Sequence, residues 1–262
     1  APCPRGPGTS ALAEGILDAL PVRRGLAAAD PIGEVAAARR RIERIALMHP
    51  GVRFSLEPLG ACGAPLRGPG GEGVDLPIAR GAAKRLSQVL GAQCLGSLRE
   101  VSHCFRGGQQ SIGPGSNSSM VLEGVVTLPH DPQASDRFTF LFVNGRYVER
   151  TPLHKLLSEL YTRCAESLAG RPMDNVGGPA SVASVASGRA WPLCALNLRC
   201  SPDDFDMGYS PDGTHVEFRD WRPPLRCMRD ALRRLFAEHS PEAYAAALED
   251  RDLVASVLPG PV

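Results

Sequence analysis

The segment Phe140–Val148 constrains the fold of this 262-residue chain more than any other, because an apolar run meets a tight-turn signal there. The β-favouring residues Phe140 to Val143 stop at Asn144-Gly145, and the chain resumes with Arg146-Tyr147-Val148. Asn-Gly favours the two-residue turn that joins antiparallel strands, since both residues accept positive φ angles. We therefore predict a β-hairpin, followed by an amphipathic helix over 151–168.

Hydrophobic periodicity along the chain predicts both helices and strands. Apolar residues recur at helical spacing over 31–48, 79–90, 151–168 and 220–236. Alternating or continuous apolar stretches predict strands at 15–20, 52–56, 98–105, 120–128, 138–148, 193–200 and 214–218. Because these elements do not follow a strict strand–helix–strand rhythm, we predict an α+β fold. Its β-sheet should be mixed, with helices packed mainly on one face.

Composition limits the kind of site that the chain can carry. The 29 basic and 28 acidic residues nearly cancel, so any basic surface must be local. None of the eight cysteines has C-x-x-C spacing, so we expect free thiols in a reducing compartment and no metal site. No apolar run approaches the ~18 residues of a membrane span, which predicts a soluble, intracellular protein. The first residue is Ala1 rather than methionine, which indicates a fragment.

Several short motifs occur in a fixed order along the chain. They are Gly8-Thr9, Leu20-Pro21-Val22-Arg23-Arg24, Ala46-Leu47-Met48-His49-Pro50, Phe142-Val143-Asn144-Gly145-Arg146 and Pro211-x-x-x-x-Val216-x-Phe218. Together they resemble the MutL family of DNA mismatch-repair proteins, over roughly residues 6 to 238. Three further segments look most like the third MutL homologue, the meiotic gamma-type subunit: Leu98–Ser102, Arg150–Leu156 and Glu217–Trp221.

The resemblance implies a domain plan. Residues 1–30 match the end of a GHKL-type ATPase domain, and residues 31–238 match a transducer domain similar to the second domain of ribosomal protein S5. Residues 239–262 form a C-terminal tail. Segments near 57–77, 106–118 and 170–190 lack periodicity and are predicted to be flexible insertions.

The resemblance also implies ATP and Mg²⁺ as cofactors of the full-length family member. The segment with the Mg-holding asparagine and the general-base glutamate is absent from this sequence, so we assign no catalytic residue. By resemblance, Gly8 and Thr9 contact the nucleotide, while Arg23 and Arg24 contact phosphate or the ATP lid. As residues alone, Gly-Thr is ordinary turn chemistry, and paired arginines also suit a solvated loop end. The family's γ-phosphate lysine aligns with Gly213, so hydrolysis by this chain alone is not expected.

Asn144, Arg146, Arg150 and Lys155 form the candidate DNA surface, at the turn and at the mouth of the following helix. Flexible cations that contact phosphates give affinity without reading sequence. The plainer alternative is that Asn144-Gly145 serves only as a turn, while Arg146 pairs with an acid such as Glu149. The run Arg39-Arg40-Arg41-Arg44 is interpreted as a solvated helix face.

Two classes of function follow from the resemblance. The first is a nuclear mismatch-repair or meiotic-recombination protein that binds DNA irrespective of sequence and forms a heterodimer with another MutL-type subunit. The second is a catalytically silent scaffold that binds a MutL-type partner. An autonomous ATPase is a third possibility, but the chain lacks the segment that would carry catalysis.

Overall fold

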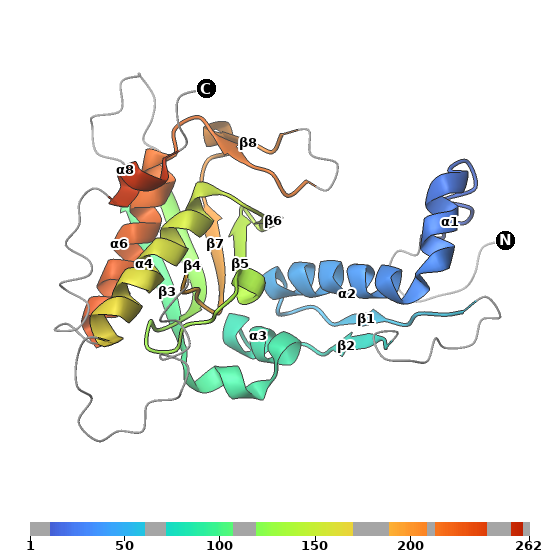
Figure 1. Cartoon of the computed structure of the whole chain (residues 1–262), viewed down its shortest axis with the longest axis horizontal. Coiled ribbons are helices and arrows are strands. Elements are labelled where there is room, and N and C mark those ends of the chain that lie inside the picture. Colours follow the sequence, from blue (N-terminus) through green and yellow to red (C-terminus); the bar gives the residue numbers. More distant parts are fainter. Residues whose placement is uncertain are drawn as a thin grey trace. The chain divides into compact units, whose positions relative to one another are not determined.

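The computed structural model describes residues 11–60, 72–106, 119–169, 189–208, 213–239 and 253–258 (Figure 1). Contacts divide the chain into two compact units, one of Ala1–Ile42 with Ser55–Asp75 and one of Glu43–Phe54 with Leu76–Val262. The predicted domain limits at residues 30 and 238 were drawn from the family resemblance and stay predictions.

The first unit has turns where the sequence predicted a strand, and a helix directly after them. Residues 16–19 form turns, and α1 (Pro21–Ala29) starts with proline at its first position, where the missing N–H costs nothing. The strand predicted at 15–20 is therefore wrong, and Arg23 and Arg24 lie on this helix. Helix α2 (Pro31–Met48) begins as predicted, because the Asp30 carboxylate accepts a hydrogen bond from the Gly33 N–H at 2.9 Å.

A small two-stranded sheet pairs β1 (Phe54–Leu56) with β2 (Val74–Leu76). Strand β2 falls inside the 57–77 segment that was predicted to be an irregular insertion, so that prediction fails for these residues. Residues 61–71 of the segment lie outside the described residues, as do 107–118 and 170–188 of the other two predicted insertions.

The second unit is built on a five-stranded mixed sheet in the order β3-β4-β7-β5-β6. Its strands are β3 (Leu98–Arg106), β4 (Ser119–Thr127), β5 (Thr139–Val143), β6 (Arg146–Val148) and β7 (Cys194–Arg199). Neighbours pair antiparallel except β5 and β7, which run parallel. The predicted α+β fold with a mixed sheet is confirmed, and the predicted hairpin at 138–148 is the β5–β6 pair.

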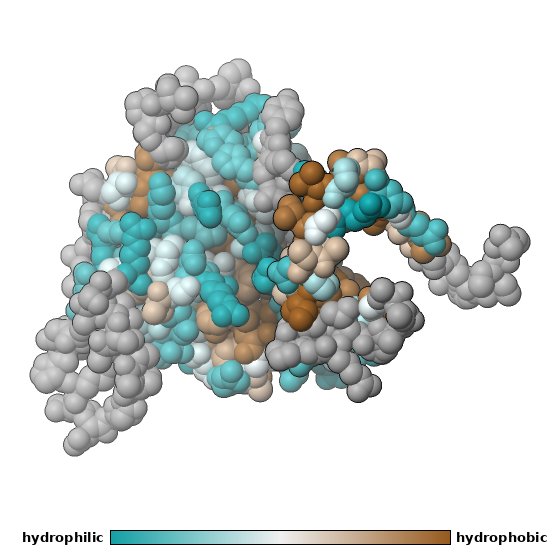
Figure 2. All heavy atoms as spheres, turned by 45° about the vertical axis from the view of Figure 1, so that its right-hand side comes forward, coloured by the Kyte–Doolittle hydropathy of each residue, from teal (hydrophilic) through white to brown (hydrophobic). Residues whose placement is uncertain are grey.

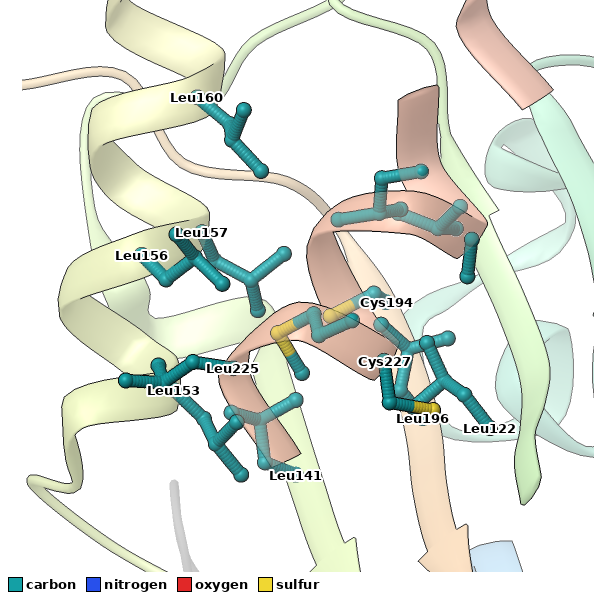
Figure 3. Close-up of a cluster of buried hydrophobic side chains, with 14 of the residues drawn as sticks. Leu122, Leu141, Leu153, Leu156, Leu157, Leu160, Cys194, Leu196, Leu225 and Cys227 are labelled. Carbon is teal, nitrogen blue, oxygen red and sulfur yellow. The ribbon is translucent and has the colours of Figure 1, made fainter. Parts of the chain in front are cut away.

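One face of this sheet carries the main helical layer and the larger core. Helices α4 (Pro152–Ala169) and α6 (Arg222–His239) pack against each other, α6 covers β3 and β4, and α8 (Leu253–Val257) packs on both helices (Figure 1). Figure 3 shows the leucines of α4 facing Leu225 of α6, with Leu141 of β5 below them and Leu196 of β7 beside Cys227 of α6. The predicted apolar stripe of α4 is fully buried, at 0 to 1% exposure: Leu153, Leu156, Leu157, Leu160 and Tyr161.

The other face is covered in part by α3 (Ala82–Leu90) and by the last turn of α2. A second core cluster there joins Leu47 of α2 and Leu86 of α3 to Val125 and Phe142 of the sheet. Within α2 only Ala46 and Leu47 are buried, and the neighbouring Ile45 is 50% exposed.

Arg85 of α3 holds the loop that follows α2. The residue is completely buried, and its Nη2 donates to the backbone carbonyls of His49 at 3.4 Å, Pro50 at 2.9 Å and Val52. Its Nη1 donates to Gln88 Oε1 at 2.8 Å. Burial lowers the pKa of the guanidinium, but arginine stays charged at any physiological pH. One side chain therefore joins three loop carbonyls, of which those of His49 and Pro50 also accept backbone N–H groups, from Val52 and Ala79.

Two small strands complete the unit. Strand β8 (Phe205–Asp206) pairs antiparallel with β9 (Glu217–Phe218). The strand predicted at 214–218 is thus confirmed only for its last two residues.

Candidate nucleic-acid interface

The turn between β5 and β6 has the backbone that its sequence predicts. Asn144 has φ of 48° and Gly145 has φ of 78°, and Val143 pairs directly with Arg146 across the turn. Two consecutive residues of positive φ match the right-handed twist of the strands. This geometry holds Arg146 at a fixed place at the start of β6.

The side-chain amide of Asn144 is bonded at both ends to Cys200, the residue that follows β7. Its Nδ2 donates to the Cys200 carbonyl at 3.0 Å, and its Oδ1 accepts from the Cys200 N–H at 3.0 Å. The Gly145 N–H donates to Asn197 Oδ1 at 2.9 Å. The parallel pairing of β5 with β7 continues through these bonds into the turn. Nothing in the local sequence marked Asn197 or Cys200 as its partners, since more than 50 residues separate them from the turn.

The three predicted cations of the interface are exposed. Arg146, Arg150 and Lys155 all belong to the solvent-exposed class, and within the described part of the chain none of their side chains makes an ion pair. Arg150 has φ of 55°, an unusual value for a residue with a Cβ. The chain turns at Arg150 from β6 into α4, so Arg150 no longer belongs to the strand that carries Arg146.

Glu149 lies between these cations in sequence but does not pair with Arg146. Its Oε1 lies 2.9 Å from Nη2 of Arg44, near the end of α2. The same guanidinium lies over the Tyr147 ring, 4.1 Å from its centroid. The predicted solvated face of the arginine run therefore excludes Arg44, which is committed to the hairpin.

The mouth of α4 is fixed by a neutral histidine. His154 is 9% exposed, and its Nδ1 accepts from the Thr151 N–H at 3.2 Å and lies 2.9 Å from Thr151 Oγ1. Burial lowers the pKa of His154 to about 4, although the nearby Asp136 carboxylate acts in the opposite direction. His154 thus contributes rigidity rather than charge. It occupies the third helical position, where glutamate or glutamine usually completes a capping box.

The predicted nucleotide contacts stay predictions. Gly8 and Thr9 lie outside the described residues. Arg23 and Arg24 are exposed on α1, and Arg24 Nη1 lies 3.7 Å from Asp18 Oδ1, an exposed pair of little energetic value.

Gly213, at the position of the family's lysine, has φ of 66°, and a Cβ added there would meet no atom within 4 Å. The Glu149 N–H donates to the Thr214 carbonyl at 3.0 Å, so this segment runs beside the end of β6.

Other chemistry is not evident in the described ranges. They contain no cluster of three or more acidic, histidine or cysteine side chains that could hold a metal ion. Their six cysteines are free thiols: Cys94, Cys104, Cys164, Cys194, Cys200 and Cys227. Among these same residues, no helix combines the length and apolar character that crossing a bilayer demands.

Comparisons with known proteins agree with the motif order. Human DNA mismatch repair protein Mlh3 is 29% identical over 255 residues, which cover 93% of this chain and 16% of Mlh3. DNA mismatch repair protein MutL of Rhodopseudomonas palustris is 27% identical over 222 residues, covering 85% of this chain and 30% of that protein. The chain therefore spans less than a third of the length of either relative.

A solved structure also matches the fold. The crystal structure of the N-terminal domain of a DNA repair protein superposes with a TM-score of 0.61 at 17% identity, covering 86% of this chain and 60% of that one. No protein-family model matches the chain.

Proposed function

Because this chain belongs to the MutL family of DNA mismatch-repair proteins, we propose that it binds duplex DNA irrespective of sequence through Arg146, Arg150 and Lys155. In the longer protein this binding is coupled to ATP. Asn144 shapes the turn through its two hydrogen bonds to Cys200, and the second hydrogen of its Nδ2 is the donor that we assign to a DNA phosphate.

The observation that carries the proposal is a set of exposed cations free of acidic partners within the described residues. An arginine that pairs with a carboxylate must give up that pair before it neutralises a phosphate. Glu149, the nearest acid in sequence, is already held by Arg44. The rigid turn and the capped helix fix the backbone from which the three cations extend, so no backbone entropy is lost there on binding.

The finer assignments are also part of the proposal. We assign the chain to a nuclear protein of mismatch repair or meiotic recombination, which acts as a heterodimer with another MutL-type subunit. The full-length protein binds ATP and Mg²⁺, with Gly8 and Thr9 at the nucleotide and Arg23 and Arg24 at the phosphates or the lid. Likeness to human Mlh3, a DNA mismatch repair protein, supports the mismatch-repair assignment, and the meiotic and nuclear assignments rest on the motif resemblance.

Salt titration of DNA binding tests the proposal. Fluorescence anisotropy with two labelled duplexes of unrelated sequence should give equal affinities, and log affinity should fall with log salt at a slope of about −3 for three phosphate contacts. Arg146→Glu, Arg150→Glu and Lys155→Glu should each weaken both duplexes equally. Arg234→Glu, which removes an exposed charge from α6, is the matched control and should have a smaller effect. Binding that ignores salt, or equal losses from all four variants, would refute this surface.

A second function, a scaffold that binds a MutL-type partner, is favoured by apolar side chains exposed in the first unit. None of the residues of α1 is buried, and apolar side chains on and before it are 68 to 85% exposed: Leu12, Ile16, Val22 and Leu26. Figure 2 shows brown, hydrophobic atoms beside teal ones on this surface. Exposed apolar clusters of this kind mark interaction sites.

Pull-down with a MutL-type subunit separates the two functions. The scaffold reading expects the partner to be retained by the wild-type chain and lost with Val22→Asp/Leu26→Asp, while DNA binding is undetectable. If DNA binding is present and the double variant retains the partner, the scaffold reading is wrong.

A further inference from the structure

Arg44 makes two different contacts, one with Tyr147 of β6 and one with Glu149 just after this strand. Its Nη2 lies 2.9 Å from Glu149 Oε1, and its guanidinium lies 4.1 Å from the centroid of the Tyr147 ring. The guanidinium of Arg44 therefore reaches both Tyr147 and Glu149, which are two residues apart in the sequence. The Arg44 and Glu149 side chains are 30% and 36% exposed, which screens the pair less than open solvent would.

The ring that carries Arg44 is itself fixed in place. Tyr147 lies 5.7 Å from the Phe142 ring in an edge-on arrangement and 6.5 Å from the Phe140 ring. A planar guanidinium can stack on such a ring while its N–H groups point outward to a carboxylate, which a lysine cannot do. The aromatic platform therefore sets where Arg44 lies, and Arg44 sets where the Glu149 carboxylate lies.

Glu149 lies close in sequence to two of the proposed DNA contacts, so its charge bears on DNA binding. The residue is adjacent to Arg150 and three positions from Arg146, both exposed and both proposed to contact phosphates. A free carboxylate at this place would repel phosphates and would compete with them for the two arginines.

We propose that Arg44 is a positioning residue of the DNA-binding face. By holding and neutralising Glu149 on the Tyr147 side of β6, it leaves Arg146 and Arg150 available to phosphates. The inference rests on the proposed function, and it adds a residue from α2 that the motif at the turn does not contain. Arg44 acts through Glu149 and does not itself contact DNA.

A double-variant experiment tests this role. Arg44→Met keeps the length of the side chain but removes its charge, and it should weaken duplex binding about fivefold to tenfold at low salt. Glu149→Gln alone should leave affinity unchanged or raise it, because the carboxylate is gone. The double variant Arg44→Met/Glu149→Gln should bind within about twofold of Glu149→Gln. With the Glu149 carboxylate gone, the loss of Arg44 no longer leaves a negative charge beside the two arginines. Arg41→Met removes an exposed charge from the same helix and is the control for net charge.

Each outcome decides a separate point. If the double variant binds as weakly as Arg44→Met, then Arg44 acts on DNA directly or through the fold, and the positioning role is wrong. An Arg44→Met variant that binds like wild type, or an Arg41→Met loss of equal size, refutes it as well.

A wild-type chain with no salt-dependent binding refutes the proposed function itself. The contact can still be judged without DNA, by a double-variant cycle on the unfolding equilibrium constant. That cycle should show coupling of about threefold or more between residues 44 and 149.

Discussion

His154 makes this protein sensitive to mild acid, and the size of the effect follows from its pKa. The unfolded chain has a histidine pKa of 6.5, whereas burial lowers that of folded His154 to about 4. At a pH between these two pKa values, His154 is protonated in the unfolded state but neutral in the folded state. Stability is therefore fully present above pH 6.5 and falls as pH drops, until the folded imidazole is protonated near pH 4.

The magnitude is a substantial part of a domain's stability. Each pKa unit corresponds to about 1.4 kcal/mol, so this shift amounts to about 3 kcal/mol over the whole window. Between pH 7.5 and pH 5 the loss of unfolding free energy from His154 alone should be about 2 kcal/mol. Protonation would also replace the Nδ1 acceptor of the Thr151 N–H by a second donor, which adds a structural reason for the low pKa.

Urea unfolding at pH 7.5 and pH 5 measures the effect against His154→Gln. Glutamine restores the usual third-position residue of a capping box and does not titrate, so the helix start should be preserved. We expect wild type to lose about 2 kcal/mol more than His154→Gln over this interval. Equal losses in the two proteins would show that His154 is not the titrating group and would refute the reasoning.

Three further predictions follow from buried positions. Gly124→Ala should lower the free energy of unfolding, measured in urea, by more than about 3 kcal/mol. Gly124 has φ of 139°, and a Cβ there would lie 2.1 Å from the Ala195 carbonyl oxygen. Full stability of the variant would refute this. Arg85→Met should cost about 1 to 3 kcal/mol, since the carbonyls of His49, Pro50 and Val52 lose the guanidinium donor. Arg85→Lys should not restore the lost stability, and an unchanged stability of Arg85→Met would contradict this role of Arg85. Exposed Cys104 should react with iodoacetamide at pH 8 far faster than buried Cys194. Burial raises the pKa of the Cys194 thiol to about 12, so little thiolate is present. Similar rates of modification at the two residues, measured by peptide mapping, would contradict this.

Structural features that depend only on residues close together in the sequence could be predicted from it. Asn144-Gly145 specified its turn, because positive φ is a property of the residues themselves. The apolar stripe of α4 and the Asp30 cap of α2 also follow from local spacing and local hydrogen bonds. Proline misled at Pro21, where the residue opens a helix instead of ending a strand, since both positions tolerate a missing N–H.

The hairpin at 140–148 and the exposed cations that follow it were thus set by the sequence alone, through backbone preference and the two-residue period of a strand. Only the tertiary structure decided what each polar group near the turn is bonded to. The parallel pairing of β5 with β7 brings Cys200 to Asn144, and the packing of α2 brings Arg44 to Glu149. Such contacts join residues more than 50 positions apart, and no local pattern encodes them, because they depend on how whole elements pack.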